Sequence, residues 1–274
     1  WNSIRNLFEP RLIAFLVIFS GFWLMFNQLF DLLPNFITDW VDSSVIYGFL
    51  GNLFHSQTLI QNAKLGVNLP AEWLINLDAF SIILFMIVIG WLFGKIKAIP
   101  AIIIGIIIAS IGVAVAGMTM SGWICIFGIF VFSIGEMIAS PRKNEYLASI
   151  APPGKKGLYM GYVMFPNAIG WSIGSKIGGY VYQNHGDKLT LAQHYLINTV
   201  HMTKEAVAAI PPENVMATLA TQLNLASTQD ATRLLFNTYH PQNVWYIFAA
   251  IGLASMVGMI IYNFVVERKR TETN

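Results

Sequence analysis

The chain has 274 residues, of which 55% are hydrophobic and only 11% are charged. About a quarter of the residues of a soluble domain are charged, so this composition argues against a soluble protein and indicates a membrane protein. The net charge of +2 is too small to suggest nucleic acid as a partner. Because Cys125 is the one cysteine, the chain has no internal disulfide framework.

Apolar runs predict the membrane-spanning segments. A helix needs about 20 apolar residues to cross a hydrocarbon core of about 30 Å. Six windows satisfy this length, in chain order Leu12–Phe36, Ile75–Phe93, Ile99–Met118, Trp123–Ala139, Leu158–Tyr182 and Val244–Val266. The chain starts at Trp1 without the pattern of a signal peptide, so we expect it to be a fragment whose beginning lies upstream.

Prolines and glycines mark two of these windows. Pro34 interrupts the first window and Pro166 the fifth. Such breaks are typical of transporters, and ordinary membrane packing is the alternative interpretation. The fifth window also has Gly170, Gly174 and Gly178 at four-residue spacing, a stripe that lets another helix approach closely.

Two connections are long, Val41–Glu72 and Gln183–Gln242. The second is polar, and a capping box at Ser227 to Asp230 predicts a helix over Ala231–Tyr239. Prolines before Asn214–Leu223 predict another helix there. A small amphipathic face is predicted from Leu196, Val200, Val207, Val215, Leu219 and Leu223. We interpret this connection as a partly helical cap on the bundle, with a binding role as the alternative.

The distribution of lysine and arginine predicts the orientation. Eleven of the 16 lie on one side of the predicted spans, namely Arg5, Arg11, Lys95, Lys97, Arg142, Lys143, Lys155, Lys156, Arg268, Lys269 and Arg270. Four lie on the other side, and Lys176 lies within a span. The richer side is therefore predicted to be cytoplasmic, with both chain ends there. The predicted organisation is five spans in residues 1–182, an outer loop in 183–242, and the last span with a basic tail in 243–274.

Ionisable groups inside a membrane are costly and are therefore candidates for function. Glu136 lies well inside the fourth window, and a structural hydrogen bond is its alternative role. Its expected partner is an ammonium group, from a substrate or from a lysine outside this chain. Lys176 either has a functional role inside the membrane or extends its ammonium group to the membrane–water interface. At a rise of about 1.5 Å per residue, Glu136 lies about 20 Å and Lys176 about 9 Å below the outer face.

These depths separate two regions. A direct contact between Glu136 and Lys176 is not expected, whereas Lys176 and Asp31 lie at more similar depth and could pair. Asp39 and Asp78 lie near the outer boundary. We predict that Asp31 or Asp39 contributes to an outer gate, with Lys176 or with a basic residue beyond this chain.

Several chemistries have no support in the sequence. The five histidines lie in the outer connections without the spacing of a metal site. A phosphate-binding Walker loop and a Ser–His–Asp arrangement at one depth are both missing. We therefore expect no metal, no cofactor and no enzymatic activity.

A family resemblance rests on the fourth and fifth windows. Gly135-Glu136 and Ser140-Pro141, followed by Gly157, Met160-Gly161 and Ala168-Ile169-Gly170, resemble the tenth and eleventh spans of the proton-dependent oligopeptide transporters of the major facilitator superfamily. Phe22-Trp23 with Gln28 is similar to the seventh-span pattern of that family, and Leu77-Asp78 resembles the start of its eighth span. The chain departs from the family at Asn27, Asp78 and Val163.

The resemblance implies an all-α membrane protein that forms the C-terminal six-helix half of a major facilitator fold. It implies substrate-binding roles for Glu136, Asn27, Gln28, Asp78 and Trp23, and gating or proton coupling by acids of the first span such as Asp31. Asp39 and Lys176 are gating candidates because of their predicted depth. The implied partners are the lipid bilayer, a missing N-terminal half, a small peptide-like substrate and protons. The implied location is a bacterial inner membrane.

The sequence thus favours one half of a proton-coupled transporter for peptides or peptide-like solutes. A major facilitator carrier for a non-peptide solute is the alternative within the same class. A membrane receptor or a membrane-embedded enzyme is the alternative of a different class.

Overall fold

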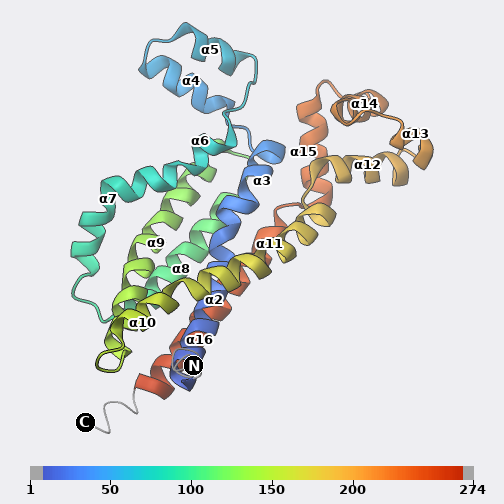
Figure 1. Ribbon diagram of the computed structural model, residues 1–274. Helices are drawn as coiled ribbons and strands as arrows, with labels where there is room; N and C mark the ends of the chain where they lie inside the picture. Colours follow the sequence, from blue (N-terminus) through green and yellow to red (C-terminus); the bar gives the residue numbers. More distant parts are fainter. Residues whose placement is uncertain (1–8, 268–274) are drawn as a thin grey trace.

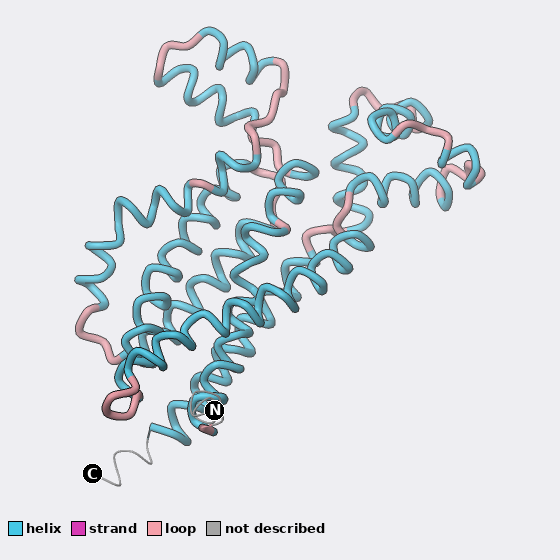
Figure 2. Tube along the Cα trace, in the orientation of Figure 1, coloured by secondary structure: helices cyan, strands magenta, loops and turns pink. Residues whose placement is uncertain are grey.

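The chain folds into helices joined by short connections (Figures 1 and 2). The computed structural model describes residues 9–267, and within them the only strand-like pairing is an isolated bridge between Asp42 and Ser121. Four of the basic residues that predict the orientation lie outside the described residues, namely Arg5, Arg268, Lys269 and Arg270. The long helices are α2 (Pro10–Asp31), α7 (Leu77–Phe93), α8 (Ala98–Gly117), α9 (Gly122–Ile150), α11 (Phe165–His185) and α16 (Asn243–Tyr262).

Five segments of the described chain are long and apolar enough to cross a membrane. They are Pro10–Asp31, Ala71–Phe93, Ala98–Gly117, Gly122–Ile150 and Asn243–Val265. These segments correspond to five of the six predicted spans and confirm an all-α membrane protein. On α7 the apolar side chains are largely exposed, with Ile83 at 78% and Ile87 at 85%. Such a surface suits lipid or another apolar partner rather than water.

The predicted span Leu158–Tyr182 differs from the other five. It consists of α10 (Lys156–Gly161), the short 3-10 helix η1 (Tyr162–Met164) and α11. It is not among the segments that qualify by apolar length, because α11 carries Asn167, Ser172, Ser175 and Lys176. This helix nevertheless runs along α2 in the bundle (Figure 1).

Proline has opposite consequences at two places. The predicted span Leu12–Phe36 is divided in the structure: α2 ends at Asp31, and α3 (Leu33–Trp40) begins after Leu32, with Pro34 in its first turn. The missing N–H of proline is harmless in a first turn, which explains the break at this position. In α9, by contrast, the helix continues through Pro141 to Ile150. The helix therefore extends well beyond Ala139, where the predicted fourth window ends.

Small residues set the closest helix contacts. A Cβ atom added to Gly112 of α8 would lie 2.3 Å from the Phe132 nitrogen of α9, so no larger residue fits. Added to Gly170 of α11, it would lie 2.7 Å from the Leu24 nitrogen of α2. Gly178 is similarly close to the Gln28 side chain. The predicted glycine stripe is thus confirmed as the contact between α11 and α2.

The first long connection, for which the sequence predicts no helix, forms a helical hairpin. It consists of α4 (Ser44–Leu53) and α5 (Gln57–Lys64), followed by the short α6 (Ala71–Ile75). At 10 and 8 residues, α4 and α5 are too short to cross a bilayer. They lie at the end of the bundle opposite the connection between α9 and α10 (Figure 1).

The second long connection forms a compact unit, here called the outer cap and defined as residues 188–239. Its helices are α12 (Lys188–Asn198), α13 (Lys204–Ala208), η2 (Pro212–Asn214), α14 (Val215–Gln222) and α15 (Thr228–Tyr239). The Asp230 N–H donates to the Ser227 hydroxyl at 3.2 Å, which confirms the predicted capping box. Four members of the predicted amphipathic face, Leu196, Val207, Val215 and Leu219, are at most 2% exposed.

Trp40 of α3 contacts both the residue that follows α11 and the outer cap. The Trp40 indole N–H donates to the Gly186 carbonyl at 2.8 Å. The Trp40 ring also packs against Phe236 of α15, with centroids 5.7 Å apart. Because α3 continues the line of α2, this packing links the cap to a helix of the bundle.

Candidate functional site

Polar side chains gather between α2, α7 and α9 inside the bundle. Ser133, Glu136, Ser140 and Lys143 are spaced by three, four and three residues, so they share one face of α9. Asp78 in the first turn of α7 contacts this face near Ser133, and Trp23 of α2 contacts it near Lys143. We call Asp78, Ser133, Glu136, Lys143 and Trp23 the polar column.

Two carboxyl groups meet at the Ser133 end of the polar column. Asp78 is 4% exposed, and its carboxylate accepts a hydrogen bond from the Ser133 hydroxyl at 2.6 Å. The carboxyl groups of Asp78 and Glu136 also lie within hydrogen-bonding reach of each other. Two adjacent carboxyl groups in a low-dielectric site cannot both be ionised cheaply, so such a pair holds a proton or attracts a cation.

Glu136 keeps one oxygen free. Its Oε2 atom is buried and has no hydrogen-bond partner within residues 9–267. An unpartnered buried oxygen on a charged group costs free energy unless a ligand, a proton or water satisfies it. Trp23 likewise has a buried indole N–H without a partner in the described chain. The polar column therefore contains both an unused acceptor and an unused donor.

Lys143 lies inside the bundle. The sequence predicts it in a cytoplasmic connection, but it is only 5% exposed, because α9 continues past Pro141 and carries the side chain into the bundle. Its Nζ atom lies 4.7 Å from the Trp23 ring centroid and 6.0 Å from that of Phe19. It also interacts electrostatically with Glu136. The ammonium group expected from a substrate or another chain is thus present two turns along the same helix.

The remaining predicted substrate-binding residues lie on α2. The Asn27 amide donates to the Asn167 Oδ1 atom of α11 at 3.1 Å. Gln28 is fully buried, and its amide donates to the Leu24 carbonyl at 2.9 Å. Because Gln28 packs against the glycine stripe of α11, the structure places it between two helices rather than in the polar column.

The predicted gating residues lie nearer the end of the bundle that carries the outer cap. Asp31 accepts a hydrogen bond from the Ser175 hydroxyl at 2.6 Å, whereas Lys176 is exposed and forms no ion pair with Asp31 in the structure. Adjacent helical residues point about 100° apart, so the contact of Ser175 turns Lys176 away. Asp31, Asp39 and Ser175 line a common cavity of about 720 Å³.

Asp39 is held by partners within this chain. It accepts a hydrogen bond from the Tyr182 hydroxyl at 2.7 Å, and the Lys188 ammonium group donates to the Asp39 carbonyl at 2.7 Å. Burial raises the pKa of Asp39 and lowers the pKa of Lys188. Lys188, which we had not singled out, therefore occupies the place expected for a basic residue beyond the chain.

The described residues offer no constellation for a metal. Within residues 9–267 no group of three or more His, Cys, Asp or Glu side chains could hold an ion. Cys125 is buried, and burial in apolar surroundings leaves a thiol inert. The chemistry available is that of charged and hydrogen-bonding groups between membrane helices.

Apolar helices around a buried charged interior define a multi-pass membrane protein with the features of a secondary transporter. The chain is 26% identical over 125 residues to the multidrug resistance protein MdtH of Proteus mirabilis, covering 45% of this chain and 31% of that protein. It is 23% identical over 180 residues to MdtH of Escherichia coli, covering 65% of this chain and 39% of that protein.

These similarities support a transporter of the major facilitator superfamily and do not single out its peptide-transporting family. The chain spans about a third of the length of the curated relatives it matches. No family model matches the sequence. No solved structure matches it.

Proposed function

We propose that this chain is part of a major facilitator transporter that carries an amphipathic organic cation by alternating access, in exchange for protons. The observation that carries the proposal is the polar column, where two carboxyl groups face one ammonium group between apolar helices. This excess of acid favours cations over anions. The naming of the relatives as multidrug resistance proteins agrees with a non-peptide solute.

Aromatic rings beside the polar column support a flat, partly apolar solute. The Trp23 and Phe26 rings lie 4.5 Å apart, and Phe26 lies 5.1 Å from Phe132. Aromatic faces attract cations as well as apolar groups. Lys143 already uses the Trp23 face, so it acts as an internal cation that a substrate cation displaces. This competition gives the site two charge-balanced states, one loaded and one empty.

A transporter for free-amine peptides is the second candidate. It is favoured by the position of Glu136 after Gly135 and before Ser140-Pro141, the segment that resembles the oligopeptide transporters. It is weakened because Lys143 supplies the ammonium group that the peptide amine was expected to bring.

The two candidates are separated by a transport assay on the full-length protein in proteoliposomes with an imposed pH gradient. One arm follows a fluorescent lipophilic cation and the other a labelled dipeptide. We expect gradient-driven transport of the cation, with Glu136→Gln and Asp78→Asn each lowering it by about tenfold or more, as for the loss of one charge-assisted hydrogen bond. Glu205→Gln, an exposed change in the outer cap, is the matched control.

Transport of the dipeptide alone would reject the cation proposal and favour the peptide reading. Normal cation transport by both variants would reject the role of the polar column. Thermal unfolding of each purified variant distinguishes loss of transport from loss of folding.

A further inference from the structure

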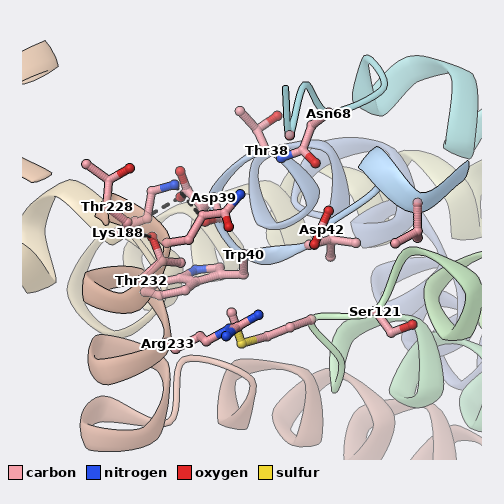
Figure 3. Close-up of a pocket in the computed structure, with 15 residues that line it drawn as sticks. Thr38, Asp39, Trp40, Asp42, Asn68, Ser121, Lys188, Thr228, Thr232 and Arg233 are labelled. Carbon is pink, nitrogen blue, oxygen red and sulfur yellow. Dashed lines mark hydrogen bonds between the residues drawn. The ribbon is translucent and has the colours of Figure 1, made fainter. Parts of the chain in front are cut away.

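A second cavity, here called the outer pocket, lies away from the polar column at the end of the bundle that carries the outer cap. It has a volume of about 520 Å³, within the range of small-molecule sites. Its walls come from the end of α3, the base of the α4–α5 hairpin, the turn between α8 and α9, the start of α12, and α15 (Figure 3). Four charged residues line it: Asp39, Asp42, Lys188 and Arg233.

Hydrogen bonds fix the walls of the outer pocket. The Asp42 N–H donates to the Met120 carbonyl at 2.8 Å, and the Gly122 N–H donates to the Asp42 carbonyl at 3.0 Å. The Ser43 N–H donates to the Asn68 side-chain oxygen at 2.9 Å. Segments that are far apart in sequence are thus held together around the cavity. A pre-formed cavity binds a ligand at a lower ordering cost than a mobile loop does.

Asp39 of the outer pocket lies beside Lys188, whereas Asp42 is separated from Lys188 and Arg233. Lys188 and Arg233 come from the outer cap on one side, and Asp42 lies on the opposite side (Figure 3). Arg233 is exposed, and the structure shows no hydrogen bond or ion pair for it in residues 9–267. The Asp42 Oδ1 atom accepts from the Ser44 N–H and hydroxyl, which leaves Oδ2 available. Lys188 uses one donor on the Asp39 carbonyl and keeps two.

We propose that the outer pocket binds a small zwitterion, whose carboxylate contacts Arg233 and Lys188 and whose ammonium group contacts Asp42. A guanidinium group matches a carboxylate in geometry and charge. A simple anion would also face Asp39 and Asp42, and a simple cation would face Arg233 and Lys188, so each meets repulsion. A molecule with both charges satisfies both sides of the pocket.

This site goes beyond the proposed transport function, because it lies outside the polar column. A ligand there would bridge α15 of the outer cap and the end of α3. Since α3 follows α2 after the break at Leu32, the bound state would tie the cap to a helix of the transport bundle.

The test measures binding to the full-length protein in nanodiscs by calorimetry. The probes are linear ω-amino carboxylates of about four to eight carbons, which sample different charge separations in a pocket of this size. The best binder is then compared with its N-acetyl form, which is only anionic, and its methylamide form, which is only cationic. We expect the zwitterion to bind about tenfold or more tightly than either form, a difference of about 1.4 kcal/mol.

Variants of Arg233 and Asp42 test which residue contacts the carboxylate of the ligand and which contacts its ammonium group. Arg233→Gln should weaken the zwitterion toward the affinity of its methylamide form, and Arg233→Lys should restore part of the difference. Asp42→Asn should weaken it toward the N-acetyl form, while its remaining side-chain oxygen still accepts from Ser44. Lys204→Gln and Glu213→Gln change exposed charges of the cap outside the pocket and should have no effect.

The Glu136→Gln variant separates this proposal from the transport function, because it should bind the zwitterion normally even when cation transport is lost. Any of three results would overturn the proposal. These are equal affinity for the three forms of the probe, no binding of any probe, and unchanged affinity in both pocket variants. Unfolding temperatures of the variants show whether a lost affinity reflects a lost fold.

Discussion

Replacing Lys143 with glutamine tests the competition on which the transport proposal depends. The change removes the internal cation while keeping a long side chain that can form hydrogen bonds. Without Lys143, a substrate cation no longer displaces an ammonium group from the Trp23 face, where Nζ lies 4.7 Å from the ring centroid. Substrate should therefore bind more tightly in the variant than in the unmodified protein.

The expected size follows from the contact that is removed. A cation–π contact contributes roughly 0.5 to 2 kcal/mol, depending on its desolvation, which corresponds to about two- to thirtyfold tighter binding. Tight binding of the substrate in the ground state slows its release, so the maximal transport rate should fall as the apparent KM falls. This paired change distinguishes competition from simple damage to the protein.

The assay is equilibrium binding of the fluorescent cation to the full-length protein, followed by transport kinetics in proteoliposomes. Lys143→Arg keeps the charge and should stay near the original affinity, and Lys204→Gln in the outer cap is the control for an exposed lysine. Weaker or unchanged binding in Lys143→Gln, with the protein still folded, would refute the role of Lys143 as an internal competitor.

Three further predictions concern topology, packing and pH. In a chain with Cys125 replaced by alanine, single cysteines at Asp187 and at Lys155 should be labelled from opposite sides of the membrane, and labelling of both from one side would reject the predicted orientation. Gly128→Ala should destabilise the protein by about 1 to 3 kcal/mol, because its Cβ would lie 2.3 Å from the Ala116 nitrogen, whereas Gly90→Ala meets open space and should be tolerated in thermal unfolding. Because burial raises the pKa of Asp39, this residue favours folding most below its unfolded pKa, and that contribution should be lost as the pH rises through its folded pKa. Asp39→Asn should remove this part of the pH dependence, and identical pH profiles of unfolding for the two proteins would contradict the interpretation.

Local patterns in the sequence located most of the long helices. Apolar runs of about 20 residues are required by the thickness of a bilayer, so five predicted spans could be located without tertiary information. The capping box at Ser227 and the glycine stripe of α11 are also local signals, and both have the predicted roles. The hairpin of α4 and α5 escaped prediction, because its helices are too short to give a clear period.

Only the tertiary structure decided which polar groups meet. Charge counting placed Lys143 in a connection, since hydropathy alone does not reveal that α9 continues through Pro141 into the bundle. The contacts of Asp78 with Ser133, and of Asp39 with Tyr182 and Lys188, join helices that are far apart in the chain. Such contacts depend on how helices pack and rotate against one another, and a rotation of one residue, about 100°, is enough to replace Lys176 by Ser175 beside Asp31.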